Sequence, residues 1–424
     1  MRISMIVGLC LSVVLSSSLM GAEVDPNVSL VGEILAATPL IDGHNDAPWA
    51  IRDRWSNQLG AFDFHDTASI ERPMHTDLER LREGGIGAQF WSVWVPTDLE
   101  GGDAVTTVIE QIDLVHRLVD RYSDELELAL TAADIRRIHA DGKIASLIGI
   151  EGGHSIDNSM AVLRALYTLG ARYMTLTHWH NVDWCDAATD APEHDGLTAF
   201  GEAVVGEMNR LGMMVDLSHV SAEVMRQVLE ITKAPVIFSH SSAFALNPHP
   251  RNVPDGILGL VAENHGVVMV NFGSYFLARS HTERWANFKA ERERLKSLHP
   301  GDPVRVEREI DEWMADHPIP TVELSVLADH VEHIGHIAGI DHVGLGSDYD
   351  GIRAFPDGMS DVTGYPQLLI ELARRGWTRE ELAKVAGENL LRVMAGVERA
   401  ATELQRTEGA EEIGFEPTLS DSGR

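Results

Sequence analysis

The chain has 424 residues, enough for two ordinary domains or for one large α/β barrel, which commonly takes about 250 residues or more. Its 65 acidic residues against 34 basic ones give a formal net charge of −31, which argues against nucleic acid or an anionic membrane surface as a partner. With 44% hydrophobic and 23% charged residues, the composition is that of a soluble globular protein with a large core.

The N-terminus predicts a secretory signal peptide over residues 1–22. Met1 and Arg2 precede the apolar run "ISMIVGLCLSVVLSSSL", and small residues follow before the acidic "EVDP". An uncleaved single-span anchor is the alternative. We therefore expect a periplasmic or secreted protein. Later stretches fall short of the roughly 20 apolar residues that a membrane span needs. Cys185 is then the one cysteine of the mature chain, which precludes an intramolecular disulfide.

Eight segments share one pattern, an apolar and β-branched run that ends abruptly in polar residues. Segments with helical periodicity lie between them, such as 158–170, 200–212 and 221–235. Strands of this kind that alternate with helices indicate a parallel sheet covered on both faces. Eight such units predict an α/β fold, a (β/α)₈ TIM barrel, and a doubly wound open sheet is the alternative because periodicity does not show closure. The eight segments are 38–46, 86–94, 143–154, 171–180, 213–221, 234–242, 266–274 and 341–350.

Two segments lie outside this alternation. Residues 280–320 are rich in charge and in helix formers, and they predict a helical excursion between the seventh and eighth strands. Residues 400–424 are polar and predict a flexible tail. The expected organisation is therefore a signal peptide at 1–22, a barrel at 23–399 and a tail at 400–424.

Candidate metal ligands gather at the ends of the predicted strands. In "LIDGHND" (40–46) a strand runs into His44 and Asp46, and residues two apart on a strand point the same way. An imidazole beside a carboxylate can present two ligands to one metal ion. Because the active site of a (β/α)₈ barrel lies at the C-terminal strand ends, we expect a metal site there. The further candidates at these ends are Glu151, His178, His219, His240 and Asp348.

The number of candidates favours two metal ions over one. More ligands are present than a single tetrahedral zinc ion takes, and a carboxylate such as Glu151 can bridge two ions. Paired ions, typically about 3.5–4 Å apart, hold a shared hydroxide and stabilise both oxygens of a hydrolytic transition state. The sequence thus predicts a binuclear hydrolase.

An ordered set of motifs resembles the membrane (renal) dipeptidase family, zinc dipeptidases of the amidohydrolase superfamily. The resemblance covers about residues 36–397 and implies a zinc-dependent dipeptidase with two zinc ions per chain and small dipeptides as substrates. It leaves open a D-residue at the C-terminal position of the substrate and a homodimeric state. The motifs, in chain order, are "DGHND", "GIEGGH", "MTLTH", "VDLSH", "FSHSSA", "RNVPD" and "GSDYDG".

The resemblance also implies how the metal ligands divide. His44 and Asp46 bind one zinc ion, His219 and His240 bind the other, and Glu151 bridges the two.

Three further residues are implied to act on the substrate. His178 contacts it and steadies the tetrahedral intermediate, Arg251 binds its free carboxylate, and Asp348 contacts it and carries the proton. A planar guanidinium suits a carboxylate because it can donate two parallel hydrogen bonds. The amine leaving group needs a proton from a nearby acid.

Two other functions stay open. One is a different binuclear amidohydrolase, such as an N-acyl-amino-acid deacylase or a lactonase. Many of these bridge their metals with a carboxylated lysine on the fourth strand, and here that strand contains no lysine. The other is a non-enzymatic binding protein on the same barrel, in which the loss of one or more ligands is expected, and none is lost.

Several other residues resemble functional residues in type or spacing. His330, His333 and His336 lie at helical spacing and could form a zinc face, although a solvated helix is the better interpretation. Trp91 and Trp94 end the second strand and are either barrel core or pocket wall. Minor candidates for the pocket mouth are His180, His194 and His249.

Overall fold

Eight parallel strands close into a barrel in the computed structural model, which describes residues 25–416. The barrel strands are β1 Leu40–Asn45, β2 Ile86–Trp94, β4 Ile144–Glu151, β5 Ala171–Thr175, β6 Met214–Asp216, β7 Ile237–Phe238, β8 Val267–Val270 and β9 Val343–Leu345. β1 pairs with both β2 and β9, and β2 pairs with β4, so the ring is complete. The predicted (β/α)₈ barrel is confirmed, and the open-sheet alternative is wrong.

One further strand, β3 (Leu126–Leu128), does not follow from the sequence. It pairs with the start of β4, Leu126 opposite Ile144, at the end of the barrel that lies away from Glu151. This segment has only three residues with a glutamate at the centre, so it lacks the apolar run that marks the other strands. It is a strand because it pairs with β4.

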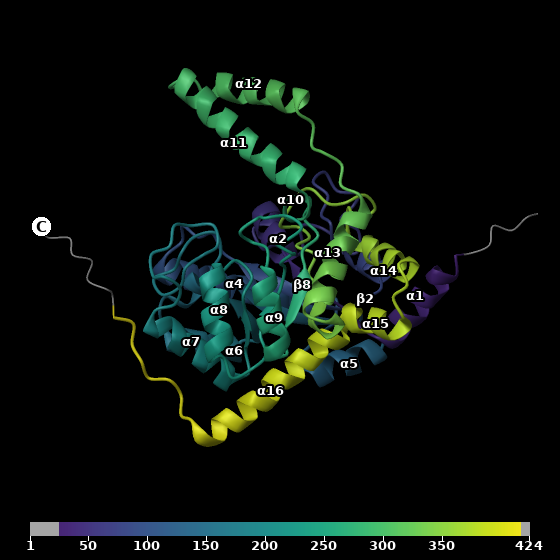
Figure 1. Cartoon of the computed structure of the whole chain (residues 1–424), viewed down its shortest axis with the longest axis vertical. Coiled ribbons are helices and arrows are strands. Elements are labelled where there is room, and N and C mark those ends of the chain that lie inside the picture. Colours follow the sequence, from purple (N-terminus) through teal and green to yellow (C-terminus); the bar gives the residue numbers. More distant parts are fainter. Residues whose placement is uncertain (1–24, 417–424) are drawn as a thin grey trace, which may run out of the picture.

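Helices cover the outside of the barrel (Figure 1). The three helices predicted between strands are present as α6, α7 and α8, and the Ser221 side chain caps α8 by accepting from the Val224 N–H. α6 ends at Thr168, so Leu169, which its periodicity placed on the buried face, is 39% exposed. The helices are α1 Pro26–Ala37, α2 Ala47–Trp55, α3 Leu78–Glu83, α4 Gly101–Arg121, α5 Ala132–Ala140, α6 Met160–Thr168, α7 Ala199–Leu211, α8 Ala222–Ile231, α9 Asp255–Asn264, α10 Ser274–Leu277, α11 Arg279–Leu298, α12 Pro303–Asp316, α13 Leu324–Ile337, α14 Tyr365–Arg374, α15 Arg379–Ala383 and α16 Asn389–Thr407.

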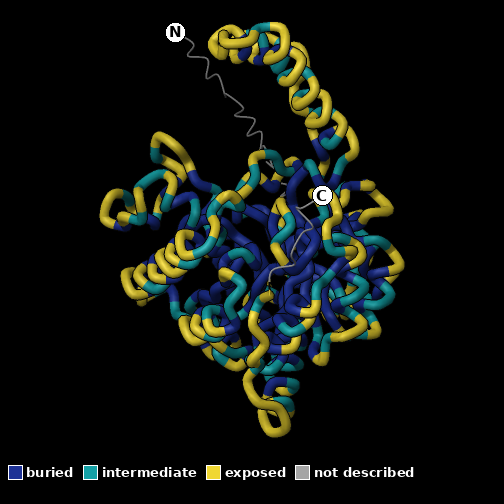
Figure 2. The backbone as a smooth tube through the Cα atoms, turned by 90° about the vertical axis from the view of Figure 1, so that its left-hand side faces the viewer, coloured by how far each residue is buried: buried dark blue, intermediate teal, exposed yellow. Residues whose placement is uncertain are grey.

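The predicted helical excursion is present as α11 and α12, a hairpin that projects away from the barrel (Figures 1 and 2). Leu295, Val306 and Ile310 form a small core within it, separate from that of the barrel. Most of its other residues are exposed (Figure 2). Because the hairpin follows β8 through α10, it rises from the end of the barrel where the strands terminate.

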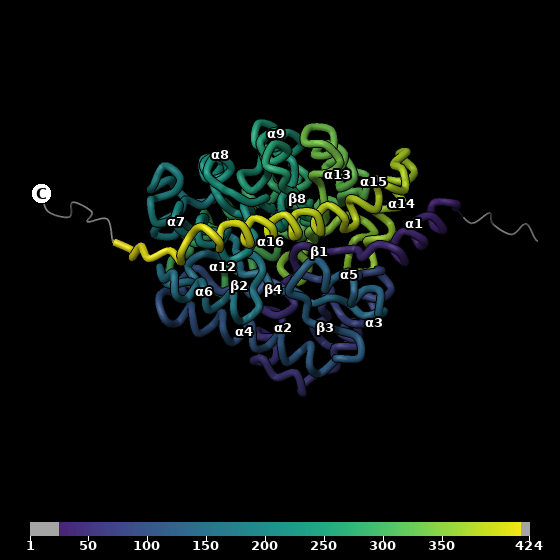
Figure 3. Tube along the Cα trace, turned by 90° about the horizontal axis from the view of Figure 1, so that it is seen from below, coloured from purple at the N-terminus to yellow at the C-terminus, as the bar shows by residue number. Residues whose placement is uncertain are grey.

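The C-terminal helix α16 runs along the underside of the barrel (Figure 3) and differs from the expected domain boundary. The helix continues to Thr407, so the boundary at 399/400 falls inside it. Val393, Val397 and Ala401 form a buried stripe, which an otherwise polar segment can supply at helical spacing. Further on, Phe415 packs against Phe200, with ring centroids 5.5 Å apart.

The predicted signal peptide and Cys10 lie outside the described residues. Between residues 25 and 416, no helix has both the length and the hydropathy that a bilayer span requires. Cys185 is a free and buried cysteine.

Candidate metal and active site

The structure brings all eight predicted site residues together at one end of the barrel. All are buried, with exposed fractions from 0% for His44 to 7% for Asp348. Parallel strands send all their C-terminal ends to the same rim, which explains why residues so distant in sequence meet. They come from β1 and β4 and from the segments that follow β1, β5, β6, β7 and β9: His44, Asp46, Glu151, His178, His219, His240, Arg251 and Asp348.

Glu151 lies at the centre of the cluster. Its Oε1 is 3.1 Å from Nε2 of His219 and 3.4 Å from Nε2 of His240. Its Oε2 is 3.6 Å from Nε2 of His44. The two carboxylate oxygens therefore face two different groups of imidazoles, which is the arrangement a bridging ligand requires.

His44 and Asp46 meet as the strand pattern predicts. Nε2 of His44 lies 3.5 Å from Oδ2 of Asp46, and both side chains belong to a group of potential ligand atoms that includes Asp348. The second and third groups are His44 with Glu151 and His240, and Glu151 with His178 and His219. The cluster is thus able to hold a cation on either side of Glu151.

Hydrogen bonds behind two histidines fix which nitrogen faces the cluster. The Tyr173 hydroxyl donates to the Gly43 carbonyl at 3.2 Å, which leaves its oxygen to accept from Nδ1 of His44 at 2.9 Å. Ser239 Oγ donates to Asp216 and so accepts from Nδ1 of His240 at 2.8 Å. With the proton on Nδ1, each imidazole presents a lone pair on Nε2, as a metal ligand must.

The backbone is strained at two site residues. His219 has φ 71° and Asp348 has φ 66°, in the left-handed region that side chains other than glycine seldom adopt. Such a conformation costs on the order of 1–3 kcal/mol and persists where the surrounding structure enforces it.

The donor set fits a metal ion. Nε2 of His44 is buried without a hydrogen-bond partner, and Nε2 of His219 lies 3.0 Å from Nε2 of His240. Because Nδ1 of His240 holds its proton, the lone pair on its Nε2 needs as a partner either a proton on Nε2 of His219 or a cation. Imidazole nitrogens and carboxylate oxygens are the ligands that zinc binds in catalytic sites.

Burial sets the protonation of the histidines. Burial, and then the positive charge of Arg251, lower the pKa of His178 and His219 well below the usual value. For His44, burial acts in the same direction but is outweighed by the Tyr173 oxygen and the carboxylates of Glu151 and Asp46, so its pKa is raised. The carboxylates thus require a positive charge at this point, which a metal ion supplies in place of a proton.

Asp348 is placed to hold a proton. Burial, followed by the negative charge of Asp46, raises the pKa of Asp348 well above its ordinary value. Its Oδ2 accepts a hydrogen bond of 2.8 Å from the side-chain amide of Asn271, which fixes the orientation of the carboxyl group. A carboxyl group whose pKa is raised in this way keeps its proton to a higher pH, as a general acid needs.

Arg251 is a buried cation without a matching anion. The side chain is 1% exposed and lies over Phe276, and burial lowers its pKa to about 10, so it stays charged at neutral pH. Its guanidinium donates to Ser241 Oγ at 3.4 Å and to the His240 carbonyl at 3.3 Å, and Nε has no hydrogen-bond partner. None of the ion pairs among residues 25–416 includes Arg251, so its charge is available to an anionic ligand.

The other histidines are structural or peripheral. His330 is fully buried, accepts from the Ala243 N–H at 3.0 Å and faces the Leu277 carbonyl at 3.0 Å, so the expectation of a solvated face is wrong for this residue. His333 pairs with Asp255 at 2.8 Å and His336 is exposed, so the three form no common zinc face. Of the pocket-mouth candidates, His249 accepts from the Arg251 N–H, His194 faces the Val182 carbonyl and His180 is exposed.

Sequence reasoning did not identify the residues that orient the ligands. Asp216 and Asn271 are polar residues within otherwise apolar strand segments, and that contrast was a signal for both. Tyr173 carries no such signal, because a tyrosine is ordinary in a barrel strand. The two tryptophans at the end of the second strand differ in their surroundings. Trp91 is fully buried in the core, whereas Trp94 is half-buried and hydrogen-bonds to His178.

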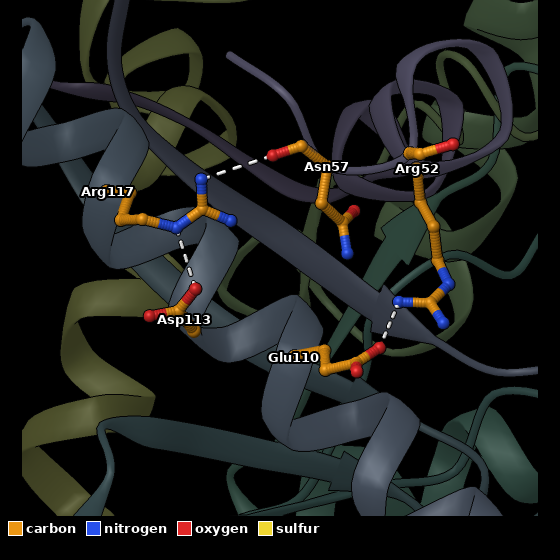
Figure 4. Close-up of a pocket in the computed structure, with 6 residues that line it drawn as sticks. Arg52, Asn57, Glu110, Asp113 and Arg117 are labelled. Atoms are coloured by element: carbon orange, nitrogen blue, oxygen red, sulfur yellow. Dashed lines mark hydrogen bonds and ion pairs between the residues drawn. The ribbon is translucent and has the colours of Figure 1, made fainter.

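A surface cavity of about 440 Å³ lies apart from this cluster, between α2 and α4 (Figure 4). Arg52 pairs with Glu110 at 2.6 Å and Arg117 pairs with Asp113 at 2.7 Å, so both of its cations are already matched. It contains none of the predicted site residues, and we assign it no function.

Fold and site together define a class, a (β/α)₈ barrel with buried imidazoles and carboxylates at its catalytic end, which is typical of metal-dependent hydrolases. The family model described as membrane dipeptidase, peptidase family M19, matches residues 29–408. The chain belongs to this family and is a metallo-dipeptidase.

Known proteins agree with this assignment. The chain is 40% identical over 397 residues to Dipeptidase verJ of Clonostachys rogersoniana, covering 91% of each chain. It is 42% identical over 366 residues to Dipeptidase 3 of Rattus norvegicus, covering 85% of this chain and 65% of the rat protein. A solved metallo peptidase from Rhodobacter sphaeroides, liganded with a phosphinate mimic of the dipeptide L-Ala-D-Ala, has a TM-score of 0.68 at 24% identity, over 85% of this chain and 99% of that one. This last likeness shows the shared fold.

Proposed function

We propose that this metallo-dipeptidase hydrolyses free dipeptides with two zinc ions. His44 and Asp46 would hold one ion, His219 and His240 the other, and Glu151 would bridge them. The separation of the Glu151 oxygens toward two groups of imidazoles supports this division. When bound, the zinc ions would supply a water activated for attack near neutral pH.

The observation that carries a dipeptide substrate is the unpaired charge of Arg251. A dipeptide has one scissile bond and a free carboxylate one residue away from it. The buried guanidinium, which takes part in no ion pair with residues 25–416, can grip that carboxylate and so set the distance from it to the metal ligands. His178 would donate a hydrogen bond to the reacting carbonyl oxygen, and Asp348 would deliver a proton to the leaving amine.

The alternative hydrolases differ in which charges their substrates carry. A lactone has no carboxylate for Arg251, whereas an N-acyl amino acid has the carboxylate but lacks the ammonium of a dipeptide. Glu151 is the proposed bridge, and the fourth barrel strand contains no lysine that could be carboxylated in its place. The ligand of the Rhodobacter sphaeroides protein motivates the inclusion of substrates with a C-terminal D-residue.

The test compares Arg251→Met with wild type on a free dipeptide, its C-terminal amide and the N-acetyl amino acid. We expect KM for the free dipeptide to rise steeply, because removal of one partner of a buried charge-assisted pair costs roughly 2–5 kcal/mol. The C-terminal amide already lacks the carboxylate, so Arg251→Met should reduce its hydrolysis little further. Arg172→Met is the matched control, because this half-buried arginine hydrogen-bonds only to backbone carbonyls and lies over the Tyr167 ring, at the opposite end of β5.

Two results would contradict the proposal. Equal losses on the free and amidated dipeptides would mean that Arg251 does not bind the carboxylate. Faster turnover of the N-acetyl amino acid than of any L,L- or L,D-dipeptide would make the chain a deacylase instead.

We also propose that the protein is exported, a proposal that rests on the segment 1–22 alone. The expected product in the native host is a mature chain outside the cytoplasm that begins near residue 23. N-terminal sequencing of the fractionated protein tests this, and a full-length chain in the cytoplasmic fraction would contradict it.

A further inference from the structure

Trp94 is the last residue of β2 and lies in register with Glu151 on the neighbouring strand β4. Its indole Nε1 lies 2.9 Å from Nδ1 of His178, with the two rings at 66° to each other. The Trp49 ring packs edge-on against the indole at 4.4 Å, and Gln111 donates to the Trp94 carbonyl at 2.7 Å. The Trp49 ring thus holds the indole, and Gln111 holds the backbone of the same residue.

This hydrogen bond has one direction. An indole N–H can only donate, so Nδ1 of His178 must accept and carries no proton. The proton of the neutral imidazole is therefore on Nε2. That nitrogen points into the cluster, 3.7 Å from Oε1 of Glu151.

Two of the three histidines among the predicted metal ligands have the opposite arrangement, whereas Nδ1 of the third, His219, has no hydrogen-bond partner. Behind His44 and His240, hydroxyl oxygens accept from Nδ1 and leave a lone pair on Nε2. Distance alone does not distinguish the three residues, because their Nε2 atoms lie 3.6, 3.4 and 3.7 Å from Glu151 for His44, His240 and His178. What distinguishes them is the group behind each ring, an acceptor for two of them and a donor for His178.

We propose that Trp94 is a positioning residue that keeps His178 out of the metal-ligand set and makes its Nε2–H a hydrogen-bond donor. Nε2–H is then directed at the oxygen that becomes negatively charged when the scissile carbonyl turns tetrahedral. The tautomer follows from the hydrogen bond itself, whereas the identity of the oxygen rests on the proposed function. Without the indole donor, the imidazole is free to move its proton to Nδ1 and to present a lone pair on Nε2.

The first experiment reads the tautomer by NMR of the zinc-loaded enzyme with ¹⁵N-labelled histidine. We expect the His178 signals, identified by their loss in His178→Gln, to show a protonated Nε2 and an unprotonated Nδ1. Trp94→Phe should shift part or all of the proton to Nδ1. Trp49→Phe removes the ring that packs on Trp94 but keeps the donor, and it should leave the tautomer unchanged. This measurement needs no substrate, so it stands even if dipeptides prove to be the wrong substrate class.

The second experiment separates positioning from packing by comparing a phosphinate dipeptide mimic with the dipeptide itself. Trp94→Phe should weaken the mimic about 10- to 100-fold, the effect of losing one hydrogen bond to a charged group, with zinc content and KM within about twofold of wild type. A protonated Nδ1 or a zinc-bound Nε2 on His178 in the wild type would overturn the proposal, even if the variant failed to fold. So would an unchanged tautomer in Trp94→Phe, a loss of zinc, or equal losses on mimic and substrate.

Discussion

Oε1 of Glu151 lies 3.1 Å from Nε2 of His219, while Oε2 of the same carboxylate is turned toward the opposite side of the cluster. The carboxylate is held there from neighbouring strands, because Ser92 Oγ donates to Oε2 at 3.4 Å and Glu151 itself ends β4. Glu151 belongs to two of the three groups of potential ligand atoms. A change at this one residue therefore affects both predicted metal positions.

Glu151→Gln should lower zinc content from about two ions per chain and remove most of the activity. The amide keeps the shape, but it carries no charge, and its NH₂ group would face one of the two groups of imidazoles. Metal analysis together with turnover measures this. Glu125→Gln, which removes a carboxylate that binds His65 and Arg82 outside the cluster, is the control and should keep its zinc. Normal turnover in Glu151→Gln would show that this residue is not the bridge.

Tyr173→Phe should weaken the binding of the ion at His44 by about 10- to 100-fold, the usual effect of losing the partner behind a ligating histidine. The hydroxyl fixes the lone pair on Nε2 because it accepts from Nδ1. Competition with a chelator gives the affinity. Tyr122→Phe is the matched control, since its hydroxyl accepts from the Phe64 N–H away from the cluster. Equal affinities in the two variants would show that Tyr173 only packs.

Asp348→Asn should retain its metal and lose on the order of 10²–10⁴-fold in kcat, as expected when a general acid–base group is removed. The amide has nearly the shape of the carboxyl group that Asn271 now holds, but it has no transferable proton. Zinc content and kcat are measured on the same preparation. If the variant is purified without metal, Asp348 is itself a metal ligand, together with His44 and Asp46.

His330 should make the fold sensitive to acid. Burial lowers its pKa from 6.5 to about 4, so the folded state resists a proton that the unfolded state accepts. Above about pH 6.5 the imidazole is neutral in both the folded and the unfolded state, so protonation does not affect the free energy of unfolding. As the pH falls from 6.5 toward 4, the unfolded state binds a proton that the folded state does not, and the free energy of unfolding decreases by at most about 1.4 kcal/mol per pH unit.

The check is chemical unfolding of His330→Gln across that pH range. Its stability should fall less below pH 6.5 than that of wild type, even if it is lower at neutral pH. His336→Gln, which changes an exposed histidine of the same helix, should follow wild type. Parallel curves for all three proteins would contradict the assignment.

The sequence by itself determined the eight barrel strands, their order along the chain and the residue types at their ends. It could do so because apolar runs that stop at His, Asp or Glu are local signals. The shared polarity of parallel strands then places all those ends on one rim. His44, Asp46, Glu151, His219 and His240 needed no structure to be proposed as ligands.

The tertiary structure decided what no local pattern encodes: the closure of the barrel, the burial of His330, the isolation of Arg251 and the nitrogen that each imidazole presents. The partners that fix these properties are distant in sequence, 129 residues for Tyr173 and His44 and 84 residues for Trp94 and His178. For His44, His240 and His178, the nitrogen that faces the cluster offers a lone pair or a proton according to whether an acceptor or a donor lies behind the ring. These contacts join strands that are not neighbours in the sheet, β5 with β1 for the first pair and β2 with the segment after β5 for the second, so they exist only once the barrel has closed.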